Sequence, residues 1–254
     1  MVETDNPLVL VARDGPVAVL RLNRPSKLNA ISSALEGALQ TAISRPEVSS
    51  SRCVVVTGGA KAFSAGADVS EMRAVDAESV FAYYAASGAA YEAVASLSQP
   101  SVSAIAGYCL GGGLELALAT DFRVAEETAT FGLPELDIGI VPSSGGTMRL
   151  ARFVGAAKAR ELVLLRRRIP AGEAHACGLV TELVPEGESF ARAMEMAAAL
   201  AELPPLAVTL ARRAIDAAAE SSRATALFIE QLAYATLVQG GESQSRIGRF
   251  LRKD

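Results

Sequence analysis

Short apolar runs that end in glycine or proline alternate with longer helical patterns over most of the chain, and this alternation constrains the fold more than any other feature. The clearest run is Cys53-Val54-Val55-Val56-Thr57, which stops at Gly58-Gly59. A continuous apolar run of this length predicts a strand that is buried on both faces. Strands separated by helices are typical of parallel sheets. We therefore expect an α/β fold.

The other predicted elements follow from the same turn and capping signals. Strands are expected at 8–12, 17–22, 53–57, 102–106 and 122–125, and helices at 31–43, 76–97 and 114–119. Short helices, turns and brief strands are expected from there to about residue 184, followed by Ala-rich helices at 189–203, 206–219 and 224–238. No charged or Ser/Gly-rich linker separates the two parts. We predict an α/β core at 1–185 with a helical C-terminal region at 186–254.

Composition excludes several classes of protein. Half of the 254 residues are apolar, which is enough for a sizeable core, and the net charge of −4 without a basic cluster argues against nucleic-acid binding. Three widely spaced cysteines and a single histidine leave few metal ligands, so we expect no metal site. The N-terminus lacks a basic and apolar signal segment, and no apolar stretch is an uninterrupted membrane span. We expect a soluble, cytoplasmic protein without membrane contact.

The familiar nucleophile and nucleotide motifs are absent. The only histidine, His175, lies in a short Ala-rich segment, and no Gly-x-Ser-x-Gly elbow surrounds any serine. Gly58-Gly59 lacks the spacing of a P-loop, and the run from Gly107 to Gly113 departs from the Gly-x-Gly-x-x-Gly pattern. These absences disfavour triad hydrolysis and a nicotinamide cofactor.

Four glycine-containing turns and two acids remain as candidates for chemistry. Each turn alone is also explained as a tight connection in an α/β fold, but a helix that begins after Gly111–Gly113 would present unpaired N–H groups to an oxyanion. Glu115 follows one turn later in an otherwise apolar helix, where a carboxyl is either solvated or held in a pocket with a raised pKa. Glu135 follows a proline beside another of these turns. The turns span 62–68, 107–115, 131–135 and 142–147.

The ordered series of these segments resembles the enoyl-CoA hydratase/isomerase (crotonase) superfamily over nearly the whole chain. The matching segments are Leu22-Asn23-Arg24-Pro25, Leu28-Asn29-Ala30, 62–68, 107–115 with Asp121 beyond, 131–135, Pro142 with Gly145-Gly146-Thr147, Arg149-Leu150, Arg167-Arg168-Ile169, Glu173-Ala174, Gly178-Leu179-Val180 and Phe250-Leu251. The resemblance implies a crotonase-like spiral of stacked β-β-α turns with a helical C-terminal oligomerisation region. It also implies a homotrimer or a dimer of trimers.

The resemblance further implies an acyl-CoA thioester substrate, with coenzyme A as part of the substrate and no separate cofactor. The implied reaction is hydration of trans-2-enoyl-CoA to 3-hydroxyacyl-CoA, in fatty-acid β-oxidation or related acyl-CoA metabolism. By motif, the oxyanion-hole N–H groups belong to Ala67 and Gly112. Glu115 is assigned as the base that activates water, and Glu135 as the group that exchanges the proton at Cα.

Substrate contacts are carried over in the same way, position by position. Ser70 stands where some members have a lysine near the CoA phosphates, so Lys27 or Arg24 is expected to supply that charge, and the Ser143 N–H is expected to help place water or substrate. Two other activities remain open: Δ3-Δ2-enoyl-CoA isomerisation, which needs one proton shuttle, and acyl-CoA binding without turnover. The expected substrate-binding residues are Arg24, Lys27, Leu28, Ala65, Ala67, Asp68, Val69, Ser143, Phe250 and Lys253.

Overall fold

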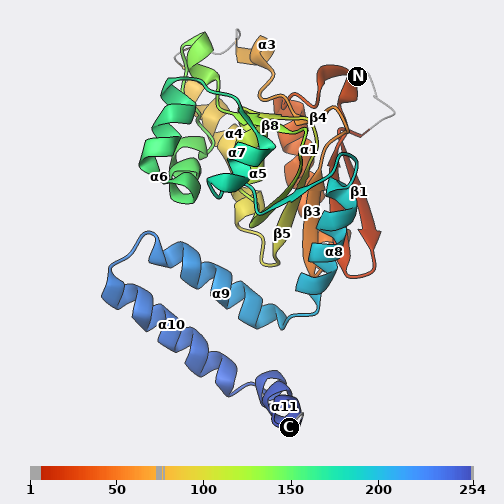
Figure 1. Cartoon of the computed structure of the whole chain (residues 1–254), viewed down its shortest axis with the longest axis vertical. Coiled ribbons are helices and arrows are strands. Elements are labelled where there is room, and N and C mark those ends of the chain that lie inside the picture. Colours follow the sequence, from red (N-terminus) through yellow and green to blue (C-terminus); the bar gives the residue numbers. More distant parts are fainter. Residues whose placement is uncertain (1–6, 73–75, 77, 253–254) are drawn as a thin grey trace.

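Two β-sheets form the centre of the molecule in the computed structural model, which describes residues 7–72, 76 and 78–252 (Figure 1). The larger sheet has the order β1-β2-β3-β5-β7-β10 and is parallel except for the β1–β2 hairpin. The smaller sheet, β4-β6-β8-β9, is parallel except for β9. The strands are β1 (Val9–Asp14), β2 (Val17–Leu22), β3 (Cys53–Thr57), β4 (Ala62–Ser64), β5 (Ser101–Ile105), β6 (Tyr108–Leu110), β7 (Phe122–Glu126), β8 (Thr130–Gly132), β9 (Ile169–Pro170) and β10 (Glu182–Val184).

The chain repeats a β-β-α unit three times, and the units stack as a spiral. Each unit places its first strand in the larger sheet and its second in the smaller one, so β3, β5 and β7 are neighbours and so are β4, β6 and β8. The units end in the helices α4 (Val80–Ala95), α5 (Gly112–Leu118) and α6 (Gly146–Leu164). The carboxyl ends of β4, β6 and β8 consequently lie side by side, and the loops that leave them meet at one edge.

Both faces of the larger sheet are buried at its central strands β3, β5 and β7, as the apolar run of β3 predicts, whereas the edge strand β1 is mostly exposed. Val54 and Val56 join the core on the side of the smaller sheet, whereas Cys53 and Val55 face the opposite side. Helix α8 (Ser189–Ala201) covers that opposite side with small residues. The first of the C-terminal helices is therefore part of the core.

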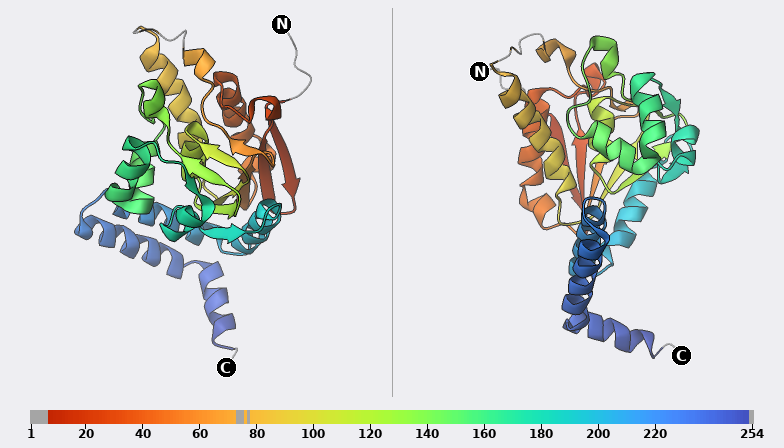
Figure 2. Two further views of the ribbon diagram at one scale, coloured as in Figure 1. Left: turned by 45° about the horizontal axis from the view of Figure 1, so that its top comes forward. Right: turned by 90° about the vertical axis from the view of Figure 1, so that its left-hand side faces the viewer.

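The last three helices extend from the core as an arm (Figure 2). They are α9 (Pro205–Ala218), α10 (Arg223–Val238) and α11 (Gly241–Phe250). The division at residue 185 stays a prediction. The remaining helical segments are η1 (Pro25–Lys27), α1 (Ser33–Ile43), α2 (Pro46–Ser49), α3 (Val69–Met72), η2 (Glu135–Ile138) and α7 (Ala171–Ala176).

No single helix in the described ranges is long and apolar enough to cross a membrane. Helices α8 and α9 reach the required length and apolar composition only when taken together, and the chain bends by 108° between them.

Among the differences from the predicted helices, two shifted starts have clear physical reasons, and one long helix replaces several short ones. Helix α1 begins at Ser33 rather than Ile31, because Ile31 bridges to Ala67 and the Ser32 side chain caps the helix by accepting the Leu35 N–H. Helix α5 begins at Gly112 rather than at 114, because its first turn packs so closely that a Cβ atom on Gly113 would lie 2.6 Å from the Ser64 oxygen. Between β8 and β10 the structure has the long helix α6, broken only at Gly155, where short helices were expected.

Arg123, on β7, supports the C-terminal end of α5 from inside the core. Its side chain is buried and donates to the carbonyl oxygens of Thr120 (2.8 Å), Leu179 (2.6 Å) and Ala117 (3.4 Å). The guanidinium also stacks on the Phe153 ring at 4.1 Å. Burial lowers its pKa to about 10, so the guanidinium stays charged at neutral pH. Its positive charge interacts favourably with the negative, C-terminal end of the α5 dipole.

We expect Arg123→Met to lower the free energy of unfolding by about 3 kcal/mol, because buried carbonyl groups would lose their donors. Urea unfolding monitored by circular dichroism measures this effect. Arg45→Met is the matched control: Arg45 is half exposed and, among the described residues, its one ion pair is with Glu47, so its loss should cost less than about 1 kcal/mol. Equal effects of the two substitutions would contradict the role given to Arg123.

Candidate active site

Three loops that leave the carboxyl ends of β4, β6 and β8 bring the predicted catalytic groups together. Ala67 follows β4, Gly112 follows β6 and Glu135 follows β8. The loops touch closely: the Gly111 N–H donates to the Gly132 oxygen at 2.9 Å, and a Cβ atom added to Gly66 would lie 3.2 Å from the Leu110 oxygen. The parallel order of the smaller sheet is what makes these distant segments neighbours.

The backbone around Ala67 pairs with Ile31, and the N–H of Ala67 itself points away from Ile31. The Ile31 N–H donates to the Gly66 oxygen, and the Ile31 oxygen accepts the Asp68 N–H, both at 2.8 Å. Among the described residues, no oxygen accepts the Ala67 N–H. The Ala67 nitrogen is thus available to a ligand.

Gly112 begins α5 and supplies a second N–H beside the first. The turn before it requires glycine, because Gly111 has a φ of +50°. The Gly112 N–H is one of the N–H groups that a helix start leaves without an internal partner, and no acceptor for it lies in the described part of the chain. A Cβ atom on Gly112 would lie 3.5 Å from the Ala67 nitrogen, so the two groups adjoin. Together they form a pair of donors suited to an oxyanion.

Glu115 lies in the first turn of α5 with its carboxyl buried rather than solvated. Its Oε1 accepts the N–H groups of Ser144 at 2.8 Å and Gly146 at 2.9 Å. The residue between them, Gly145, has a φ of +93°, so the loop forms a backbone nest of the kind that binds anions. We call residues 144–146 the Glu115 nest. It favours the ionised form of this carboxyl.

Glu135 stands at the start of η2 against the N-terminus of α5, in a different environment. A Cβ atom on Gly111 would lie 3.1 Å from its Oε1. Its Oε2 is buried and has no hydrogen-bond partner in the described structure. A carboxyl oxygen in that position favours the neutral acid, because nothing compensates a buried negative charge.

The two carboxyls consequently titrate differently. Burial raises the pKa of Glu115 above its ordinary value, and the nest N–H groups and, after them, the Arg149 charge offset part of that rise. Burial raises the pKa of Glu135 to about 7, and the negative charge of Glu115 adds to that rise. Glu115 therefore ionises before Glu135, and the pair can hold one proton near neutral pH. Two acids with separated pKa values are suited to act as base and acid.

The segments that carry most of the predicted substrate contacts lie against the same loops. The Ala65 N–H donates to the Leu28 oxygen at 3.0 Å, which joins η1 and its following turn to the loop after β4. Arg24 pairs with Asp68 at 2.7 Å and donates to the Ala30 oxygen, so its charge is already engaged. Hydrogen bonds from Ser70 and then Arg24 lower the pKa of Asp68 to about 2.

Three predicted contacts lie elsewhere or are of a different kind. Phe250 is on α11, at the far end of the arm from the site, and its side chain is 76% exposed (Figure 1). Lys253 lies outside the described residues. Ser143 is exposed at the entrance to the Glu115 nest, but the backbone N–H groups that contact Glu115 belong to Ser144 and Gly146.

Side chains that the sequence did not single out support the site from behind. The Tyr91 hydroxyl lies 2.9 Å from where a Cβ of Gly112 would be, and Arg149 donates to the Ser144 oxygen at 3.0 Å. Arg149 belongs to a segment quoted for the resemblance, but nothing in a single sequence distinguishes it from a surface arginine. Backbone donors such as the Ser144 N–H leave no mark in the sequence at all.

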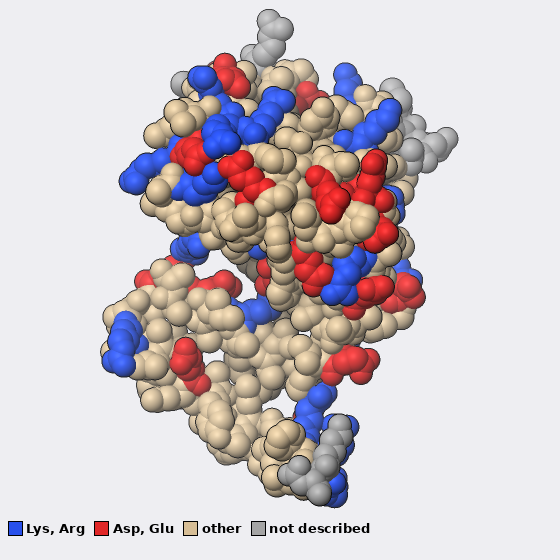
Figure 3. Space-filling view, in the orientation of Figure 1, with Lys and Arg blue, Asp and Glu red and all other residues tan. Residues whose placement is uncertain are grey.

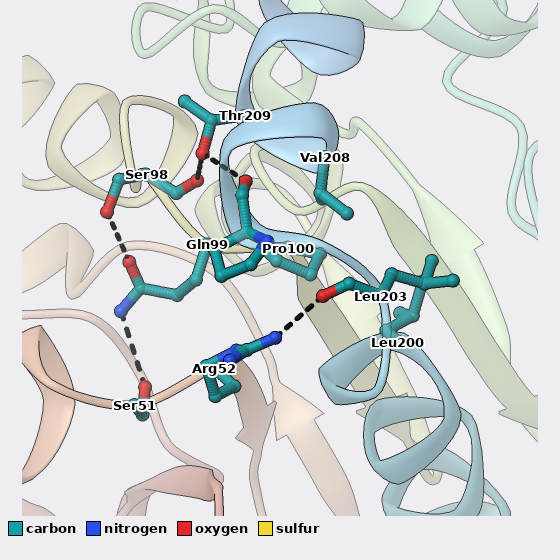
Figure 4. Close-up of a pocket in the computed structure, with 10 residues that line it drawn as sticks. Ser51, Arg52, Ser98, Gln99, Pro100, Leu200, Leu203, Val208 and Thr209 are labelled. Atoms are coloured by element: carbon teal, nitrogen blue, oxygen red, sulfur yellow. Dashed lines mark hydrogen bonds between the residues drawn. The ribbon is translucent and has the colours of Figure 1, made fainter. Parts of the chain in front are cut away.

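Other features of the structure lie outside this site. A cavity of about 80 Å³ at the junction of α8 and α9, lined by residues that include Arg52, Gln99 and Thr209, contains none of the predicted site residues (Figure 4). His175 contacts the Val180 oxygen at 3.1 Å. In the described ranges no three His, Cys, Asp or Glu side chains gather as a metal site requires. The expectation of a reaction without a metal or separate cofactor stays a prediction.

Residues 12–254 match the sequence profile of the enoyl-CoA hydratase/isomerase family. A curated relative, the short-chain-enoyl-CoA hydratase of Clostridium acetobutylicum, is 34% identical over 247 residues, which cover 96% of this chain and 95% of that protein.

Solved structures agree with the fold. The crystal structure of enoyl-CoA hydratase from Bacillus anthracis superposes with a TM-score of 0.90 at 36% identity, covering 97% of this chain and 96% of the other. The structure of enoyl-CoA hydratase from Thermoplasma volcanium gives a TM-score of 0.90 at 31% identity, with 96% and 97% covered. The predicted fold class and the predicted resemblance are both confirmed.

Proposed function

Because this chain belongs to the enoyl-CoA hydratase/isomerase family, we propose that it hydrates trans-2-enoyl-CoA thioesters to 3-hydroxyacyl-CoA. The observation that carries the proposal is the pair of buried carboxyls with different hydrogen-bonding environments, beside two N–H groups that have no acceptor among the described residues. Glu115 is held in a nest that favours its ionised form, and Glu135 is held where its neutral form is favoured. Hydration needs one base and one acid, and this pair supplies both.

The proton movements follow from that arrangement. Ionised Glu115 takes a proton from water as the water oxygen bonds to Cβ of the substrate. The Cα=Cβ electron pair moves toward the thioester carbonyl, whose developing negative charge is stabilised by the N–H groups of Ala67 and Gly112. Neutral Glu135 then gives its proton to Cα. Water has been added across the double bond, and the single proton of the pair has passed from Glu135 to Glu115.

The substrate assignments extend the proposal to the CoA portion. Leu28, Ala65 and Val69 border the thioester site, and Val69 is 55% exposed. Since Arg24 is paired with Asp68, we assign Lys27, which is exposed and forms no ion pair among the described residues, to the CoA phosphates. Coenzyme A arrives as part of the substrate, so no separate cofactor is required.

Apolar exposure on the C-terminal arm supports self-association as a homotrimer or a dimer of trimers. On the face that Figure 3 shows, the arm carries few charged groups compared with the core above it. A partner subunit packed there would bury this surface and could bring its own Phe250 and Lys253 to the site. The exposed apolar side chains on the arm are Leu206, Ile215, Leu227, Phe228, Leu232, Tyr234, Ile247, Phe250 and Leu251.

The pathway and the compartment complete the proposal. We place the reaction in fatty-acid β-oxidation or related acyl-CoA metabolism, and we place the protein in the cytoplasm. The alternative, Δ3-Δ2-enoyl-CoA isomerisation, would use a single carboxyl as proton shuttle, and the unpartnered Oε2 of Glu135 makes it the better shuttle of the two.

The direct test is to add the purified protein to crotonyl-CoA and follow the loss of the conjugated thioester absorbance. We expect saturable hydration, with 3-hydroxybutyryl-CoA identified by mass spectrometry. Conversion of a 3-enoyl-CoA without hydration of crotonyl-CoA would favour the isomerase instead. Saturable binding of crotonyl-CoA without any turnover would show a binding protein and refute both enzymatic assignments.

A further inference from the structure

The Glu115 nest is itself held in place by a side chain. Arg149, one turn into α6, folds back so that its Nη1 donates to the Ser144 oxygen at 3.0 Å. That carbonyl belongs to the peptide between the two N–H groups that bind Glu115. Gly145 permits the contact, because a Cβ atom there would lie 2.2 Å from Nη1 of Arg149. The guanidinium and the glycine therefore form one arrangement.

The same guanidinium is anchored on its other side by a different helix. Its Nη2 pairs with Glu92 of α4, and the Arg149 side chain is only 10% exposed. Helix α4 also carries Tyr91, whose hydroxyl adjoins Gly112 at the oxyanion site. One helix therefore braces both halves of the candidate site, and Arg149 is the connection to the base.

Few other charges act on Glu115. Glu135 of η2 lies across the site. Burial raises the pKa of Glu36 of α1, which accepts the Ser87 hydroxyl at 2.6 Å, and the Glu115 charge adds a small part to that rise. Both are acids, so neither stabilises the ionised form of Glu115. Arg149 is the only cation that lowers the pKa of Glu115 among the described residues, and its charge is partly offset by Glu92.

We propose that Arg149, anchored by Glu92, is a positioning residue that keeps the Glu115 nest in its binding conformation and so holds the Glu115 carboxylate where it can take a proton from water. The inference rests on the proposed hydration. Its mechanism is indirect: the guanidinium touches neither the water nor the thioester, but it fixes the carbonyl whose peptide plane orients the nest. A displaced base of this kind lowers the rate of the chemical step more than it weakens substrate binding.

The test compares Arg149→Gln with the wild type in crotonyl-CoA hydration as a function of pH. We expect kcat to fall about 10- to 100-fold with KM changed less than about threefold. Removing a positive charge raises the pKa of Glu115, so the acid limb of kcat/KM should move up by about 0.5 to 1 pH unit. Arg149→Lys keeps the positive charge, so its acid limb should lie close to that of the wild type. Its kcat should recover less, because lysine lacks the guanidinium geometry that holds the Ser144 carbonyl.

Arg152→Gln is the matched control, since Arg152 lies on the same helix, pairs with Glu220 and does not contact the nest. It should leave both kcat and the acid limb unchanged. The inference is overturned if Arg149→Gln leaves the acid limb in place and its loss of activity equals the loss of folded protein measured by circular dichroism. Arg149 would then have a purely structural role. A wild type without hydratase activity overturns the proposed function, and this inference with it.

Discussion

Glu115→Gln should lower kcat for crotonyl-CoA hydration by about 10³-fold, or roughly 4 kcal/mol, because an amide cannot take the proton from water. The substitution should leave the fold intact. The amide oxygen of glutamine can still accept the N–H groups of Ser144 and Gly146, which hold Oε1 in the native protein. Steady-state kinetics with crotonyl-CoA measures the loss, and KM should change little.

The matched control is Glu126→Gln, a buried glutamate on β7 that accepts the hydroxyl of Ser189, the first residue of α8, at 2.9 Å and belongs to none of the three site loops. It should keep wild-type kcat. Glu115→Gln also distinguishes the two enzymatic assignments. A variant that retains full isomerisation of a 3-enoyl-CoA would show that Glu115 is dispensable there, and unchanged hydration would remove it from the mechanism.

The strands were predictable because their sequences carry strong local signals. β3 has the predicted bounds, since five residues of high strand propensity end at two glycines. The start of α5 was less predictable, because glycine is a poor helix former yet is required there. A Cβ atom on Gly113 would lie 2.6 Å from the Ser64 oxygen, so packing outweighs helix propensity at this position.

The candidate site was predictable where a side chain carries the chemistry. Glu115 and Glu135 stand out as acids beside glycine turns, and the parallel order of the smaller sheet brings their loops together. The nest was not predictable, because its donors are backbone N–H groups whose direction depends on the Gly145 conformation. The different preferences of the two acids depend on burial and unpartnered atoms, neither of which a single sequence specifies.

Glu135→Gln should lower kcat by about 10³-fold as well, and it should change the pH profile in a way that Glu115→Gln does not. The active enzyme carries one proton on the carboxyl pair. Activity therefore falls at low pH, where both groups are protonated, and at high pH, where both are ionised. Burial raises the pKa of Glu135 to about 7, so the alkaline limb of wild-type kcat/KM should lie near neutral pH.

The residual activity of Glu135→Gln should lose that alkaline limb and keep the acid limb, because the remaining titrating group is Glu115. Glu115→Gln should show the opposite pattern. Dehydration of 3-hydroxybutyryl-CoA passes through the same transition state, so its kcat/KM must follow the same profile as hydration. An alkaline limb that persists in Glu135→Gln would assign that titration to another group and remove Glu135 as the acid that protonates Cα.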